Sequence, residues 1–189
     1  MTKSLLLGAI LGGLTAFVWS SFSWEVLGWH EKPMLAFQNE DEVAAVIASH
    51  TPQSGVYLLP GAPAAGLTAE QKKAAAEAQI TKMQKGPIVF AAVRTGGFGS
   101  YTRGLIIQLL SLMAAAALLT WLVLQTSGLS YARRVVFLAA VGLASSVIVD
   151  LPNWNWWGFS GEYTVVNLVD FTLMWLFAGF VIAKVAKSR

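Results

Sequence analysis

Several polar side chains interrupt the long apolar stretches of this 189-residue sequence. Asp170 lies about six residues inside the last stretch, and Asn167 precedes it by one helical turn on the same face. An ionisable side chain inside a membrane span costs about 2.5–3.5 kcal/mol to insert, so it is a candidate for function. The candidate binding residues, which all fall near the same end of their stretches, are Asp170, Asn167, Gln108, Ser146 and Asp150.

Two kinds of chemistry are open to these residues. They could bind a ligand, a proton or a lipid headgroup. Alternatively, Asp170 is a helix-packing acceptor that is protonated or paired with Arg103 or Gln108. A proton path through the membrane is poorly supported, because the opposite halves of the apolar stretches carry no ionisable residue.

Catalytic motifs are sparse. The sequence contains no cysteine, no G-x-S-x-G nucleophile motif and no H-E-x-x-H zinc motif. His30, Glu31 and Glu162 could be imagined as metal ligands, but their spacing matches no metal-binding motif. We therefore predict no metal and no cofactor, assign no catalytic residue, and expect a protein that is not an enzyme.

Three of the eight tryptophans fall within four positions of the stretch LPNWNWWGFSGEY, residues 151–163. Indole rings favour the headgroup zone of a bilayer, where an apolar body and a polar N–H are both accommodated. The pattern predicts an interfacial turn that also covers the polar cluster. The predicted interfacial residues are Trp154, Trp156, Trp157, Arg103 and Glu162.

The composition places these residues in a membrane protein, since 56% of the chain is hydrophobic and only 12% is charged. A spanning helix needs about 20 apolar residues, and four segments qualify: residues 4–24, 104–125, 135–151 and 164–184. The first could instead be a cleaved signal peptide. Gly8-x-x-x-Gly12 within it is a helix-packing pattern, which favours a retained span.

The distribution of charge predicts the orientation of the spans. Six basic residues and no acidic ones occupy the two ends and the loop between the second and third spans: Lys3, Arg133, Arg134, Lys184, Lys187 and Arg189. Loops on the cytoplasmic side are enriched in Lys and Arg. We therefore expect a multi-pass protein with both termini in the cytoplasm.

The segment 25–103 is expected to form a small extracytoplasmic α/β domain between residues 1–24 and 104–189. Helices are predicted near 40–50, capped by Asn39, and near 68–85, where Thr68 and Gln71 have capping-box spacing. Short strands are predicted at 33–37, 54–60 and 87–93, and crossovers of this length are compatible with parallel pairing. The fold class expected is thus a mainly α membrane protein with four transmembrane helices and this inserted domain.

The stretches LPNWNWWGF, SGVYLLP and KGPIVFAAV resemble those of a group of functionally uncharacterised bacterial inner-membrane proteins. The resemblance covers most of the chain and implies a bacterial inner-membrane location. It carries over no activity to particular residues.

Two functions are compatible with the sequence. The first is a non-enzymatic accessory subunit, assembly factor or lipid-contacting scaffold, with membrane lipids and either a membrane-protein partner or a second copy as its partners, and no nucleic acid. The alternative is a transporter or an outer-leaflet enzyme that uses the polar site around Asp170. A continuous polar stripe through the helices would favour transport, and the sequence lacks one.

Overall fold

The computed structural model describes residues 2–186 and divides into two compact units. The helical unit comprises residues 1–35, 100–155 and 159–189. The second unit comprises residues 36–99 and 156–158.

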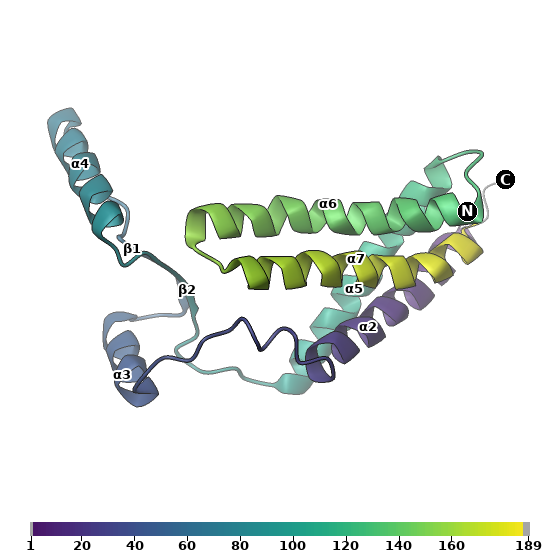
Figure 1. Ribbon diagram of the computed structural model, residues 1–189, viewed down its shortest axis with the longest axis horizontal. Helices are drawn as coiled ribbons and strands as arrows, with labels where there is room; N and C mark the ends of the chain where they lie inside the picture. The colour runs from purple at the N-terminus through teal and green to yellow at the C-terminus, as the bar shows by residue number, and fades with distance from the viewer. Residues whose placement is uncertain (1, 187–189) are drawn as a thin grey trace. The chain divides into compact units, whose positions relative to one another are not determined.

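Four long helices are apolar enough to cross a membrane, as expected of a multi-pass membrane protein (Figure 1). The first is continuous and consists of α1 (Thr2–Leu7), a π-helical segment η1 (Gly8–Gly12) and α2 (Gly13–Glu25). The others are α5 (Tyr101–Gln125), α6 (Tyr131–Trp157) and α7 (Gly161–Val185). The four predicted spans are confirmed as helices, and each is longer than predicted.

The last three of these helices begin three or four residues earlier than their apolar stretches suggest, because a serine precedes each one. The side chains of Ser100, Ser130 and Ser160 accept hydrogen bonds from the backbone N–H groups of the residues three positions ahead. Such N-caps satisfy donors that a helix start otherwise leaves unpaired. The polar residues after each serine therefore belong to the helix.

The predicted turn at 151–163 is wrong in its extent. Helix α6 continues through Pro152 to Trp157, so the tryptophan run forms its last turns rather than a loop. The helix ends where Gly158 adopts a left-handed φ of 76°, and α7 begins three residues later. Aromatic residues do not stop a helix, whereas glycine in this conformation does.

Glycines allow the first helix to lie close to its neighbours. A Cβ at Gly12 would lie 2.6 Å from Ile182 of α7, and a Cβ at Gly13 would lie 2.6 Å from the backbone Cα of Met113 in α5. Small residues let backbones approach in this way in membrane helices. The predicted packing role of Gly8-x-x-x-Gly12 agrees with this geometry, because both glycines are buried.

The core of the helical unit lies where α2, α5 and α7 meet, and α6 packs on the other side of α7 through Gly142 and Leu138. The buried cluster consists of Ala16, Leu112, Ala116, Leu119, Val123, Leu138, Met174, Trp175, Ala178, Ile182 and Ala186. Every member is apolar. The buried polar side chains of the same unit are Ser23, His30, Thr120, Ser146, Asp150, Thr164, Asn167 and Asp170.

The second unit contains α3 (Glu40–His50), α4 (Ala69–Lys85) and an antiparallel pair of strands, β1 (Gly55–Leu59) and β2 (Val89–Val93). The two predicted helices are confirmed, and so is the capping box at Thr68 and Gln71. Neither helix contains a buried residue.

Three expectations for this segment are wrong. The strands pair antiparallel, with Gly55 opposite Val93, rather than parallel. Residues 33–37 form turns and irregular chain, since the sheet has only two strands and offers them no partner. Asn39 precedes α3 in a left-handed conformation, with φ 53°, and its side chain makes no capping hydrogen bond.

Candidate functional site

Asp170 lies in the middle of α7 with its side chain turned into the helical unit, and the residue is only 4% exposed. Trp19 Nε1 and Ser23 Oγ, which lie one turn apart on α2, each donate a hydrogen bond of 2.7 Å to Asp170 Oδ1. His30 Nε2 lies 3.3 Å from Asp170 Oδ2. Both carboxylate oxygens therefore have donors, as a buried carboxylate requires.

His30 reaches this position because the chain folds back after α2. Gly28 adopts a left-handed φ of 62°, which favours glycine. The His30 ring, 1% exposed, lies parallel to Trp24 with centroids 4.1 Å apart, and meets the edge of Trp29 at 5.8 Å. Two indoles thus hold the imidazole against α2.

Ser23 joins the histidine and the carboxylate. Its Oγ donates to Asp170, accepts a hydrogen bond of 2.8 Å from Trp29 Nε1, and lies 3.1 Å from His30 Nε2. We refer to Asp170, Trp19, Ser23, Trp29 and His30 as the Asp170 cluster. Its hydrogen bonds tie α2 and the following turn to α7.

The donor–acceptor pattern assigns a proton to His30 Nε2. Ser23 has one hydroxyl proton, and the 2.7 Å contact to Asp170 uses it. Nε2 must then donate, and its proton is shared between Asp170 Oδ2 and Ser23 Oγ. His30 Nδ1 is buried and has no hydrogen-bond partner among the described residues. Leaving an acceptor nitrogen unpaired there costs less than leaving an N–H donor unpaired, which agrees with a proton on Nε2.

A second polar group connects α6 and α7. Asp150 accepts hydrogen bonds from Ser146 Oγ and from Asn167 Nδ2, the latter at 3.1 Å. All three residues are at most 8% exposed. We refer to Asp150, Ser146 and Asn167 as the Asp150 cluster.

A pocket of about 430 Å³ opens beside Asp170, between α2, α5 and α7. Its lining residues are Ser20, Trp24, Gln108, Leu112, Asp170, Phe171 and Met174. We call it the Asp170 pocket. Gln108 is an exposed residue of α5, and its amide is one of the polar groups that line the pocket.

The structure thus divides the five candidate binding residues into two groups. Asp170 and Gln108 line one pocket, whereas Asn167, Ser146 and Asp150 bond to one another.

The predicted interfacial residues contribute to neither cluster within the described chain. Trp154 and Trp156 are 53% and 70% exposed, and Arg103 and Glu162 are also exposed. Trp157 is half-buried and stacks on Phe90 within the second unit.

Sequence reasoning missed the tryptophans that do contact the site, namely Trp19, Trp24 and Trp29. The spacing of Trp19 and Ser23 places both on one face of the first helix, which is a signal the sequence contains. Nothing in the sequence shows that the chain after Gly28 returns to the same helix. As for metals, residues 2–186 bring together no group of three His, Cys, Asp or Glu side chains.

Comparison with protein-family models, with curated proteins and with solved structures finds no match to this chain.

Proposed function

We propose that this chain is a non-enzymatic integral protein of the bacterial inner membrane, and that it contacts lipid as a scaffold or accessory subunit. The proposal includes the Asp170 pocket as the site that receives the polar end of a membrane lipid. The observation that carries it is the composition of that pocket, which combines polar groups available for bonding with an apolar wall.

The polar side of the Asp170 pocket has both acceptor and donor capacity. An ionised carboxylate offers about four acceptor positions, and the Asp170 cluster occupies three of them. The exposed Gln108 amide adds N–H donors and an acceptor oxygen. A group that carries N–H or O–H donors and an acceptor oxygen, such as an ethanolamine or glycerol headgroup, would satisfy both side chains.

The apolar side suits the remainder of a lipid. Leu112, Phe171 and Met174 line the pocket together with the ring of Trp24. Small-molecule sites generally combine such apolar walls with a few polar groups that fix orientation. A lipid fits this arrangement better than a free polar solute, which would leave the apolar wall unused.

Contacts between Ser23, His30 and Asp170 raise the alternative of an acyl-transfer enzyme, but their arrangement does not support it. In a serine nucleophile relay, the serine and the carboxylate bond to different nitrogens of the histidine. Here both face Nε2, and the Ser23 proton already goes to Asp170. His30 therefore has no free acceptor directed at Ser23.

Transport through the bundle also receives little support. The core between α2, α5 and α7 consists of apolar residues such as Ala116, Leu119 and Ile182. Beyond the two clusters, α5 buries the polar side chain of Thr120, whose hydroxyl donates to the Ala116 carbonyl of its own helix. One buried threonine does not form a continuous polar path. A lipid-contacting role needs no such path.

Orientation in the membrane forms part of the proposal. The six cations and absence of acids at the termini and the α5–α6 loop favour a cytoplasmic location for both. The Asp170 pocket would then lie toward the outer leaflet. A membrane-protein partner or a second copy of the chain is compatible with this arrangement, and nucleic acid is not expected.

The test is native mass spectrometry of the protein purified in a mild detergent, comparing Gln108→Leu with the wild type. We expect the variant to lose several-fold of its co-purifying lipid. Gln125→Leu is the matched control, since Gln125 ends the same helix and does not line the pocket. Equal lipid retention by all three proteins would contradict the proposal, and turnover of a lipid headgroup lost in Asp170→Asn would favour the enzyme instead.

A further inference from the structure

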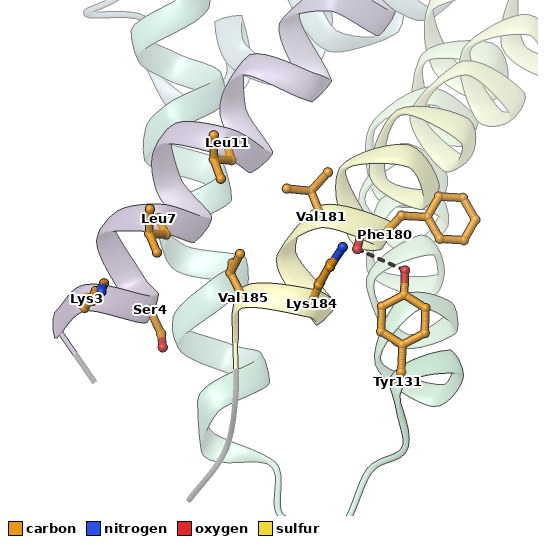
Figure 2. A pocket seen from close by; sticks show the side chains of 9 residues that line it. All are labelled: Lys3, Ser4, Leu7, Leu11, Tyr131, Phe180, Val181, Lys184 and Val185. Carbon is orange, nitrogen blue, oxygen red and sulfur yellow. Dashed lines mark hydrogen bonds between the residues drawn. The ribbon is translucent and has the colours of Figure 1, made fainter.

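A second and larger pocket lies at the other end of the helical unit. Its volume is about 940 Å³, and its lining residues are Lys3, Ser4, Leu7, Leu11, Tyr131, Phe180, Val181, Lys184 and Val185 (Figure 2). We call it the lysine groove. Twenty residues separate Lys3 from Ser23 along one continuous helix, so the groove and the Asp170 cluster are about 30 Å apart.

The charge of the lysine groove has one sign. Lys3 of α1 and Lys184 of α7 line it, and no acidic residue does. Both lysines are exposed, and neither ammonium group has a hydrogen-bond or ion-pair partner within residues 2–186. Arg134 of α6 follows the lining residue Tyr131 by three positions, but it does not itself line the groove. Its guanidinium donates a 2.6 Å hydrogen bond to the Ala186 carbonyl at the end of α7.

Behind the lysines the groove is apolar. Leu7 and Leu11 follow Lys3 at successive turns of the first helix, and Val181 faces them from α7 (Figure 2). From Lys3 to Leu11 this wall extends about 12 Å. Tyr131 closes one side, and its hydroxyl donates a 3.1 Å hydrogen bond to the Phe180 carbonyl.

We propose that the lysine groove binds one anionic phospholipid. Its headgroup binds at the basic end of the groove, which Lys3 of α1 and Lys184 of α7 both line, and an acyl chain lies along Leu7, Leu11 and Val181. Basic pockets between transmembrane helices bind lipid headgroups in this way. This inference does not rest on the Asp170 pocket or on the function proposed for it.

Two features select the occupant. The apolar wall beyond the lysines would be unused by free phosphate, whereas a phospholipid places its chain there. A zwitterionic lipid brings its own ammonium, which the two lysines lining the groove repel, so a lipid with net negative charge is preferred.

The experiment uses the full chain in nanodiscs of phosphatidylcholine that contain a minor fraction of phosphatidylglycerol. Native mass spectrometry measures how much phosphatidylglycerol stays bound after release from the disc. Replacing both lysines, Lys3→Gln with Lys184→Gln, is expected to weaken retention about 30-fold, from the loss of two cations near a headgroup. Arg133→Gln is the control, because it removes an exposed cation at the same end that does not line the groove.

A second variant tests the apolar wall while it leaves both charges in place. Leu11→Trp fills the groove from a position that is 40% exposed, so it adds bulk outside the core. We expect it to reduce phosphatidylglycerol retention too. Unchanged retention in the double lysine variant, an equal loss in Arg133→Gln, or equal retention of phosphatidylcholine by the wild type would each overturn the proposal. Gln108→Leu should leave this binding intact, which keeps the result separate from the test of the Asp170 pocket.

Discussion

The ring of Trp24 lies flat on the ring of His30, with their planes 3° apart. The same histidine donates to Asp170, so its ring takes part in both stacking and a hydrogen bond. The two contacts can be removed separately, which makes their relative importance measurable.

His30→Phe keeps a flat ring beside Trp24 but leaves Asp170 Oδ2 without its donor. His30→Gln retains an N–H donor and loses the stacking. An unpaired buried acceptor costs about 1–3 kcal/mol, whereas aromatic stacking contributes about 0.5–1.5 kcal/mol. We expect His30→Phe to be the less stable variant in denaturant titrations in detergent, followed by circular dichroism. The reverse order would show that stacking, not the hydrogen bond, holds the turn after α2.

Substitutions of Asp170 should fall into two classes. Asp170→Asn keeps an acceptor oxygen for Trp19 and Ser23, whereas Asp170→Leu leaves the donors of Trp19, Ser23 and His30 unpaired. Each unpaired donor costs about 1–3 kcal/mol, so the leucine variant should unfold at a clearly lower temperature. Val169→Leu, at an exposed neighbouring position, is the control and should match the wild type. Equal stability of the Asn and Leu variants would mean that the hydrogen bonds to Asp170 add nothing.

The hydrogen bond between Asp150 and Asn167 joins α6 to α7. A double-mutant cycle with Asp150→Ala and Asn167→Ala should give a coupling energy near 0.6 kcal/mol and below about 1.7 kcal/mol, the range for hydrogen bonds between membrane helices. The same cycle between Asp150 and Gln108 should give no coupling, because these residues belong to different groups. Coupling in the second cycle but not in the first would contradict the division into two clusters.

Alanine at Gly13 places its Cβ against backbone atoms of Met113, which cannot rotate away. We expect Gly13→Ala to reduce stability by about 1–3 kcal/mol, as overpacking generally does. Gly161→Ala is the matched control, since nothing lies within 4 Å of its added Cβ. Thermal unfolding of both variants in one detergent gives the comparison, and a neutral Gly13→Ala would argue against close contact between α2 and α5.

The proposed orientation can be tested without altering the background, because the chain contains no cysteine. Single cysteines at Lys3 and Arg133 should be protected from an impermeant thiol reagent in intact cells, whereas a cysteine at Ala65 should react. Permeabilised cells, in which all three should react, provide the control. Labelling of the Arg133 position from outside would reverse the assignment.

The four helices could be predicted from the sequence because each is a long apolar stretch with few charges. Their starts could not, because the polar residues after Ser100, Ser130 and Ser160 lower the hydropathy without breaking the helix. Hydropathy reports burial in lipid, whereas helix bounds follow from capping and from glycines such as Gly158.

The polar residues of the site were visible in the sequence, but their grouping was not. Asn167 and Asp170 are three residues apart, which places them about 60° apart around α7. That angle is enough for Asn167 to face α6 while Asp170 faces α2. Which neighbour lies on each side is a property of the packed helices and cannot be read from one helix alone.

The π-helical segment Gly8–Gly12 sets the angular phase between the two halves of the first helix. Lys3 and Leu7 precede it and face the lysine groove, whereas Trp19 and Ser23 follow it and face Asp170. An ordinary α-helix made of the same residues would rotate one half against the other by about 100°, the angle of the one extra residue that the π-helical segment absorbs. The rotation would turn one of the two ends away from its partners. This one wide turn therefore allows a single helix to contribute to both sites at once.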